Sequence, residues 1–175
     1  MRKLLNSELE RKTVEEFRTA PKAPFIVVLD NVRSQGNVGS IFRTADAFLT
    51  EAVYLCGITA TPPARDILKT ALGATDSVKW KYFASTADAV RDLKQDGYMI
   101  LAIEQAEGSV PLNMFSVEKG TKYALIFGHE VKGVDESVMD LVDGCIEIPQ
   151  FGIKHSFNIA VSAGIVLWEL TKGVE

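Results

Sequence analysis

The fold class of this chain can be read from residues 25–48, FIVVLDNVRSQGNVGSIFRTADAF. The first five residues form a continuous run of large apolar side chains, which is typical of a strand buried on both faces of a parallel sheet. A polar loop with two glycines, Gly36 and Gly39, follows this run. Apolar residues then recur at helical spacing from residue 41 to residue 48. A strand, a glycine-containing loop and a helix in this order predict the first unit of an α/β fold.

The same alternation continues along the chain. Further strands are predicted at residues 52–56, 77–83, 98–103, 123–127 and 145–148. Further helices are predicted at residues 64–71, 86–94, 134–140 and 158–172. Strands that alternate with helices predict an α/β domain with a mostly parallel sheet flanked by helices.

The size and composition of the chain fit one main domain with a short extension. Its 175 residues, 47% of them hydrophobic and 24% charged, suffice for one core and exclude a disordered chain or a disulfide-rich scaffold. Residues 1–24 have the pattern of one or two short helices ended by Pro21 and Pro24, so we expect a helical extension there and a domain over residues 25–175. The net charge of −4, from 19 Lys and Arg against 23 Asp and Glu, indicates no overall attraction for nucleic acid.

The sequence also predicts the compartment. Cys56 and Cys145 both stand in apolar settings, so we expect buried free thiols, which suit a reducing compartment. The N-terminus turns polar at Asn6 and has no apolar signal-peptide core. No apolar run approaches the roughly 20 residues of a membrane span. These features predict a cytoplasmic protein with no membrane association.

Three polar, glycine-containing segments follow predicted strands. They are residues 31–43, residues 128–133 and residues 148–158. In a parallel α/β sheet, ligands bind in the crevice beyond the carboxyl ends of the strands. Because a glycine allows close approach of the backbone to a ligand, the three segments together predict one binding site.

Each segment also has a purely structural interpretation as a helix cap. Asn37 or Ser40 could cap the helix after the first segment. Glu130 could cap the short helix after Gly133, and Ser156 could cap the last helix. The first segment lacks the Gly-x-Gly pair of a dinucleotide site and the Gly-Lys-Ser or Gly-Lys-Thr of a phosphate loop. A Rossmann-type nucleotide-binding enzyme is therefore the weaker alternative.

Arg43 is the residue that most favours a bound anion. We place it in the first turns of a helix, where a cation opposes the helix dipole. A guanidinium there indicates an anionic neighbour, such as Glu130 or a substrate phosphate. An arginine on a solvated helix face is the structural alternative. His129 and His155 are not spaced as a metal pair, so we expect no metal.

Taken in order, the three segments resemble the motifs of the SpoU family of RNA ribose methyltransferases, within the wider SPOUT superfamily. The matching residues are Asn37, Gly39 and Arg43 in the first motif, Gly128, Glu130 and Gly133 in the second, and Ile148, Pro149, Gly152, Ser156 and Asn158 in the third. The resemblance covers residues from about 25 to 172. Agreement of three motifs in order is far more specific than agreement of any one.

This resemblance implies a SPOUT-type fold with a C-terminal trefoil knot that forms a pocket for S-adenosyl-L-methionine. It implies that residues 25–175 are the methyltransferase catalytic domain. It also implies a homodimer whose active site combines residues of both subunits, and an RNA substrate. The expected activity is methylation of a ribose 2′-hydroxyl of RNA. A catalytically silent RNA-binding protein of the same fold is the alternative.

The resemblance also implies roles for individual residues. Arg43 would act on the ribose hydroxyl, while Asn37, Glu130, Ser156 and Asn158 would position it and shape the site. Cofactor contacts would come from Ile103, Gly128, Ile148, Ser156 and Phe157, mostly through backbone atoms. Because a guanidinium stays protonated at neutral pH, we favour electrostatic stabilisation of the developing alkoxide by Arg43. Water or another group would then take the proton.

Two features of the chain bear on its RNA and cofactor. His129 and Phe157 stand where relatives usually carry Pro or Asn and Leu, which could reshape the cofactor pocket. Many relatives have an additional RNA-binding domain that this sequence does not show, which favours tRNA over rRNA. Candidate contacts to the phosphate backbone are Arg2, Lys3, Arg11, Lys12, Arg18, Lys22, Arg33 and Arg65.

Overall fold

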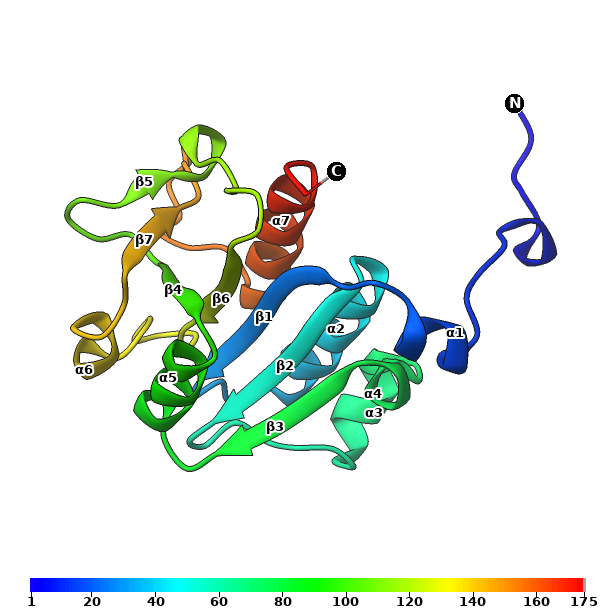
Figure 1. Ribbon diagram of the computed structural model, residues 1–175, viewed down its shortest axis with the longest axis horizontal. Coiled ribbons are helices and arrows are strands. Elements are labelled where there is room, and N and C mark those ends of the chain that lie inside the picture. Colours follow the sequence, from blue (N-terminus) through cyan, green and yellow to red (C-terminus); the bar gives the residue numbers. More distant parts are fainter. Residues whose placement is uncertain (175) are drawn as a thin grey trace.

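One parallel sheet organises the protein in the computed structural model, which describes residues 1–174 (Figure 1). Its strands are β1 (Ala23–Asp30), β2 (Thr50–Cys56), β3 (Lys79–Phe83), β4 (Tyr98–Ile103), β5 (Val110–Pro111), β6 (Lys122–Phe127) and β7 (Gly144–Glu147). They pair in the order β3-β2-β1-β6-β4-β7-β5, and each of these pairs is parallel. The predicted α/β class with a parallel sheet is confirmed.

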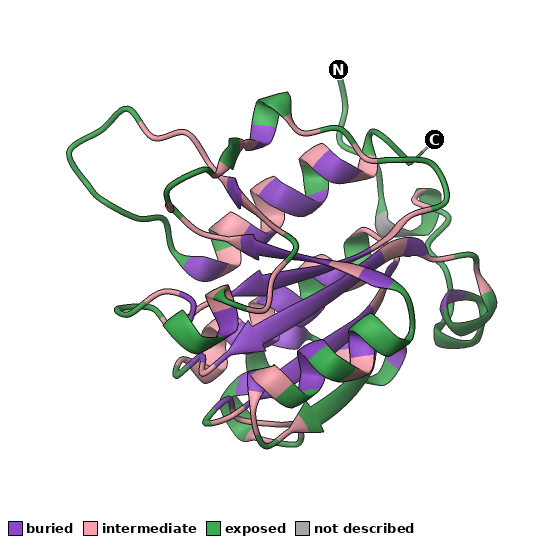
Figure 2. Cartoon of the chain, turned by 60° about the vertical axis from the view of Figure 1, so that its left-hand side comes forward, coloured by how far each residue is buried: buried purple, intermediate pink, exposed green. Residues whose placement is uncertain are grey.

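Helices cover both faces of this sheet. The longer ones are α2 (Gln35–Ala47), α5 (Thr86–Gln95) and α7 (Ile159–Thr171), and the shorter ones are η1 (Asn6–Glu8), α1 (Val14–Thr19), α3 (Arg65–Ala71), α4 (Ala74–Ser77), η2 (Leu112–Met114) and α6 (Glu136–Met139). Val27 and Leu29 of β1 share one core with α2, α3 and α7, whereas Ile26 and Val28 share a second core with α5 and α6. The central strands are accordingly buried between helices (Figure 2).

Three predicted elements have different bounds in the structure. Helix α2 begins at Gln35, several residues before the first apolar residue of its pattern, because the Ser34 side chain accepts a hydrogen bond from the backbone N–H of Asn37. The predicted strand over residues 77–83 is instead the end of α4 followed by β3. The predicted helix over residues 134–140 contains only the four-residue α6.

Short elements at the edges of the fold account for the other differences. Strand β5 has two residues at one edge of the sheet, too few for a recognisable pattern, and was not predicted. Cys56 is a buried free thiol, as predicted, but Cys145 on β7 is only half-buried. The prediction of a buried thiol was wrong for Cys145, because β7 pairs near the sheet edge with the short β5 on one side.

The helices η1 and α1 precede β1, and Figure 1 shows the first residues of the chain reaching away from the sheet. Thr13 caps α1 in a capping box with Glu16, in which each side chain accepts a hydrogen bond from the other residue's backbone N–H. The Arg18 guanidinium donates to the backbone oxygen of Asp76 at 2.7 Å, which ties α1 to α4. None of the helices in residues 1–174 is long and apolar enough to cross a membrane.

Candidate functional site

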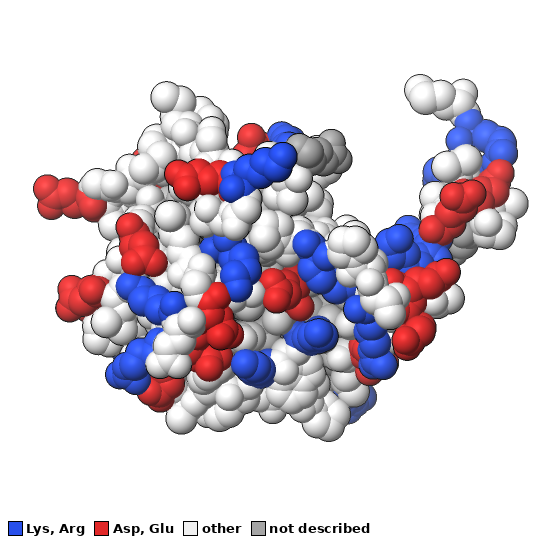
Figure 3. Space-filling model, in the orientation of Figure 1, with Lys and Arg blue, Asp and Glu red and all other residues white. Residues whose placement is uncertain are grey.

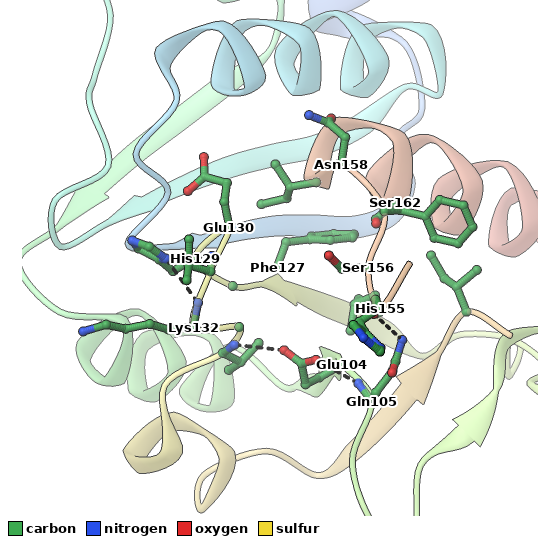
Figure 4. Close-up of a pocket in the computed structure, with 18 of the residues that line it drawn as sticks. Glu104, Gln105, Phe127, His129, Glu130, Lys132, His155, Ser156, Asn158 and Ser162 are labelled. Atoms are coloured by element: carbon green, nitrogen blue, oxygen red, sulfur yellow. Dashed lines mark hydrogen bonds between the residues drawn. The ribbon is translucent and has the colours of Figure 1, made fainter. Parts of the chain in front are cut away.

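A pocket of about 740 Å³ lies beyond the carboxyl ends of β4, β6 and β7 (Figure 4). Its floor is formed by the ends of the strands, including Ile103 and Phe127, and its walls by residues 128–134 and 155–159. This volume falls within the roughly 300–1,000 Å³ of small-molecule sites. The pocket is at the edge of the sheet where the sequence placed a ligand.

The structure separates the predicted site residues into two groups. Those that line the pocket are Ile103, Gly128, Glu130, Ile148, Ser156, Phe157 and Asn158. Asn37 and Arg43 do not line it. The second and third predicted segments therefore surround one cavity, and the first segment stands beside it.

The loop after β6 closes tightly on itself. The backbone N–H of His129 donates to the oxygen of Gly133 at 2.9 Å, and the N–H of Gly133 donates back at 2.8 Å. Gly133 has a φ of +71°, which favours glycine. A Cβ added to Gly128 would lie 2.1 Å from the backbone carbon of Gly133. Both motif glycines are therefore required for the loop to close.

His129 stabilises the tip of this loop through its side chain. Its Nδ1 accepts hydrogen bonds from the backbone N–H groups of Val131 at 3.0 Å and Lys132 at 3.3 Å. An accepting Nδ1 requires the neutral ring to carry its proton on Nε2. An asparagine oxygen could accept similar local bonds, so His129 fits the loop that the family motif describes.

Glu130 joins the loop after β6 to the loop after β1. Its carboxylate accepts hydrogen bonds from the backbone N–H of Ser34 at 2.9 Å and of Arg33 at 3.1 Å, and from Asn37 Nδ2 at 3.4 Å. Partial burial by itself raises the pKa of Glu130, but these hydrogen bonds lower the pKa more, so it lies below the ordinary carboxyl value. The alternative that Glu130 caps the following helix was wrong, because Asp135 caps α6.

Asn37 is the point where all three segments meet. Besides its bond to Glu130, its Oδ1 accepts a hydrogen bond from Asn158 Nδ2 at 3.1 Å. Asn158 also caps α7, since its Oδ1 accepts from the backbone N–H of Ala160 at 2.9 Å. The structure therefore contradicts three proposed caps: Ser34 and not Asn37 or Ser40 caps α2, and Asn158 and not Ser156 caps α7.

Arg43 lies apart from this junction. It is the ninth residue of the thirteen in α2, so its placement in the first turns of a helix, where a cation opposes the dipole, was wrong. The error came from the apolar spacing, which begins later than the helix does. Arg43 is exposed and is not among the hydrogen-bonded or ion-paired side chains of residues 1–174. The suggested contact between Arg43 and Glu130 is replaced by the contact between Asn37 and Glu130.

Gly39 serves helix packing and not close approach of a ligand. A Cβ added there would lie 2.3 Å from the backbone oxygen of Ile67 on α3. Gly39 is buried where α2 packs against α3. The first motif therefore combines a residue at the site, Asn37, with a residue that lets α2 pack closely.

Sequence reasoning missed polar residues at the end of β4. Glu104 and Gln105 both line the pocket, and Figure 4 shows their side chains beside His155. The available signal was their position directly after a predicted buried strand, which places them at the ligand-binding edge. Among residues 1–174, no group of three or more His, Cys, Asp or Glu side chains could hold a metal ion.

The fold and the pocket together define a class: a parallel α/β protein with a small-molecule site at the carboxyl edge of its sheet, closed by two glycine-containing loops. The chain belongs to the SpoU rRNA Methylase family, whose model matches residues 24–168. The resemblance inferred from the three motifs is thereby confirmed.

Individual relatives agree with this assignment. The chain is 31% identical over 166 residues to the tRNA (guanosine(18)-2′-O)-methyltransferase of Thermus thermophilus, with 93% of this chain and 82% of that protein covered. It is 30% identical to the 23S rRNA (guanosine-2′-O-)-methyltransferase RlmB of Neisseria meningitidis, with 83% and 57% covered. The crystal structure of an AdoMet-bound rRNA methyltransferase from Sinorhizobium meliloti superposes with a TM-score of 0.78 at 30% identity. That comparison covers 87% of this chain and 58% of the other.

Proposed function

We propose that this protein transfers a methyl group from S-adenosyl-L-methionine to a ribose 2′-hydroxyl of RNA. The observation that carries this proposal is the junction at Asn37, which binds Glu130 and Asn158 and so assembles the three family motifs beside one pocket. We favour tRNA over rRNA as the substrate. The relative named for tRNA is matched over 82% of its length, whereas the relative named for 23S rRNA is matched over 57%.

The pocket suits an adenosyl group. Ile103, Phe127, Ile148 and Phe157 contribute apolar surface, and the loop over residues 128–133 contributes backbone polar groups. Sites for such ligands combine apolar surface with placed hydrogen-bonding groups, and this pocket offers both. When bound, S-adenosyl-L-methionine would supply an electrophilic methyl group on its sulfonium. The apolar side chains would exclude water from it, and Ser156 with Asn158 would help to shape the site.

We propose that Arg43 stabilises the negative charge that develops on the ribose oxygen, and that water or a further group takes the proton. Arg43 lies six residues beyond Asn37 on α2, which corresponds to about 9 Å along the helix axis. Since Arg43 does not line the pocket of its own chain, its proposed role would be served if it faced the pocket of a second copy of the chain. This placement supports a homodimer in which each active site uses both subunits.

The exposed face of α7 also supports a homodimer. Val161 and Trp168 are 50% and 60% exposed, and they lie seven residues apart, so they share one face of the helix. Burial of such apolar surface favours association. Light scattering should give a dimer mass for the wild type, and Trp168→Glu should shift it toward the monomer. A monomer mass for the wild type would contradict this proposal.

Other proposals follow from family membership. Residues 25–175 would form the catalytic domain, with residues 1–24 as an extension, and the C-terminal segment would form the trefoil knot. Because the net charge is −4, the positive charge that would bind the RNA phosphates must be concentrated in one part of the surface. Figure 3 shows basic side chains, together with acidic ones, along the extension. The two free cysteines and an RNA substrate support the cytoplasm as its compartment.

Incubation with S-adenosyl-L-methionine labelled on its methyl group tests the proposed activity. Labelled 2′-O-methylnucleosides are expected after nuclease digestion of tRNA, and fewer from rRNA. Arg43→Ala should abolish transfer while leaving cofactor binding in place, and Lys119→Ala, which removes an exposed cation outside the site, should not change it. RNA binding with no methylation by the wild type would support the silent RNA-binding protein instead.

A further inference from the structure

Two carboxylates outside the family motifs hold the loop that forms one wall of the pocket. Strand β6, from which this loop leaves, lies between β1 and β4. Asp30 is the last residue of β1, and its Oδ2 accepts a hydrogen bond from the backbone N–H of Asp135 at 2.9 Å. Glu104 directly follows β4, and its Oε2 accepts from the backbone N–H of Val134 at 3.1 Å. Consecutive amides of the loop are therefore held from both neighbouring strands.

The two carboxylates differ in what else they contact. Asp30 is 1% exposed and also accepts hydrogen bonds from Thr86 Oγ1 and from Asn31 Nδ2, so it belongs to the protein interior. Glu104 lines the pocket, and its Oε1 accepts from the backbone N–H of Gln105 at 2.9 Å. Each carboxylate oxygen of Glu104 thus accepts a hydrogen bond from one backbone N–H group. Of the two carboxylates, Glu104 and not Asp30 lines the pocket.

Gln105 holds the opposite wall of the pocket, formed by residues 155–159, through a hydrogen bond. Its Nε2 donates a hydrogen bond to the backbone oxygen of His155 at 3.0 Å (Figure 4). His155 belongs to the segment that carries Ser156 and Asn158 into the pocket. Two adjacent residues at the end of β4 therefore hold both pocket loops, which are otherwise exposed at their tips.

We propose that Glu104 and Gln105 are positioning residues that order both loops before the cofactor binds. Ordering a loop costs conformational entropy, and a loop that is already ordered spares the ligand that cost. The pair therefore raises affinity for S-adenosyl-L-methionine without touching the reacting atoms. This inference rests on the proposed function for the identity of the ligand.

Isosteric substitutions test the proposal with little change in packing. Glu104→Gln puts an NH₂ group against one of two backbone N–H donors, and Gln105→Glu replaces a donor by an acceptor facing the His155 oxygen. In each variant, a backbone N–H or C=O group of a pocket loop loses its hydrogen-bond partner. This loss should weaken binding of S-adenosyl-L-methionine roughly tenfold in calorimetry. The KM for the cofactor should rise by a similar factor, while kcat at saturating cofactor and the affinity for tRNA stay near wild type.

Asp143 provides a matched control. Its carboxylate accepts a hydrogen bond from the backbone N–H of Ile100 at 2.8 Å and pairs with Lys94, in the turn before β7 and outside the pocket lining. Asp143→Asn should lower the thermal stability and leave the affinity for the cofactor within about twofold. A cofactor affinity of Glu104→Gln within that same range would overturn the positioning role.

Hydrogen exchange separates this inference from the proposed function. In the wild type without cofactor, the amides of Val134 and Asp135 should be protected, and Glu104→Gln should accelerate exchange at Val134 about tenfold. If the wild type binds no S-adenosyl-L-methionine, the proposed function fails, whereas the exchange result still decides whether Glu104 orders the loop. Unchanged exchange in Glu104→Gln would overturn the inference by itself.

Discussion

Replacement of Gly39 by alanine probes the packing that places the first motif. The new Cβ would lie 2.1 Å from Thr70 Oγ1 and 2.3 Å from the backbone oxygen of Ile67, whereas ordinary contact begins at 3.4 Å. The threonine side chain can rotate away, but the Ile67 oxygen belongs to the backbone of α3. Helix α3 must therefore move by about 1 Å, or α2 must shift and carry Asn37 with it.

The size of the effect follows from two opposing contributions. Overpacking of a tightly packed interior costs about 1–3 kcal/mol, and a clash with backbone puts Gly39→Ala at the upper end of this range. The higher helix propensity of alanine offsets up to about 1 kcal/mol of this loss of stability. We expect a net loss of about 2 kcal/mol in the free energy of unfolding, which is roughly 4–8 °C in Tm for a chain of this length.

Urea unfolding followed by circular dichroism measures this loss, and Gly36→Ala is the control. Gly36 lies on the same helix, but its added Cβ would meet only Ser34 Oγ at 3.8 Å, an ordinary contact. This variant should be neutral or up to about 1 kcal/mol more stable than wild type. If Gly39→Ala unfolds at the same urea concentration as Gly36→Ala, close packing of α2 on α3 does not explain the glycine.

Three further predictions concern the junction and the cysteines. Asn158→Ala removes the cap of α7 and the hydrogen bond to Asn37. It should lower the free energy of unfolding in urea by about 1 kcal/mol and reduce methyl transfer. Full activity would show that the contact between Asn37 and Asn158 is not needed for function. Because the folded state lowers the pKa of Glu130, its contribution to stability is present above the ordinary pKa of about 4.3 and is lost as the pH falls through the lowered value. Glu130→Gln should therefore lower Tm more at pH 7 than at pH 3, and an equal loss at both would refute this linkage. Burial raises the pKa of the Cys56 thiol to about 12. Iodoacetamide at pH 8 should therefore label the half-buried Cys145 first, which mass spectrometry of tryptic peptides can measure. Equal labelling of the two cysteines would contradict the burial of Cys56.

Strand prediction succeeded where a segment is long and buried on both faces. The run over residues 25–29 lies in β1, whose residues Val27 and Val28 are fully enclosed, so local hydrophobicity was sufficient. Prediction failed for β5, which has two residues and depends on pairing with β7. It also failed for the start of α2, because a polar first turn capped by Ser34 has no apolar pattern.

The candidate site was predicted as a set of segments and only partly as a set of contacts. The motif resemblance marked Glu130 and Asn158, yet their common partner Asn37 lies 93 and 121 residues away in sequence. Arg43 stands in the same motif as Asn37 but lies outside the pocket, because the helix carries it away along its axis. Glu104 belongs to no motif, and its position after a predicted strand places it near the site without showing which groups it contacts.

The sequence by itself determined the α/β class, the parallel sheet and the three polar segments, because hydrophobic period and glycine spacing are local properties of the chain. The family followed from the resemblance of those three segments, taken in order, to the SpoU motifs. Only the tertiary structure decided which polar groups meet. Asn37 joins the motifs, Gly39 packs a helix, and Glu104 holds a pocket wall because packing of the whole sheet sets the ångström-scale distances on which hydrogen bonds depend. That packing involves residues far apart in the sequence, which no local pattern encodes.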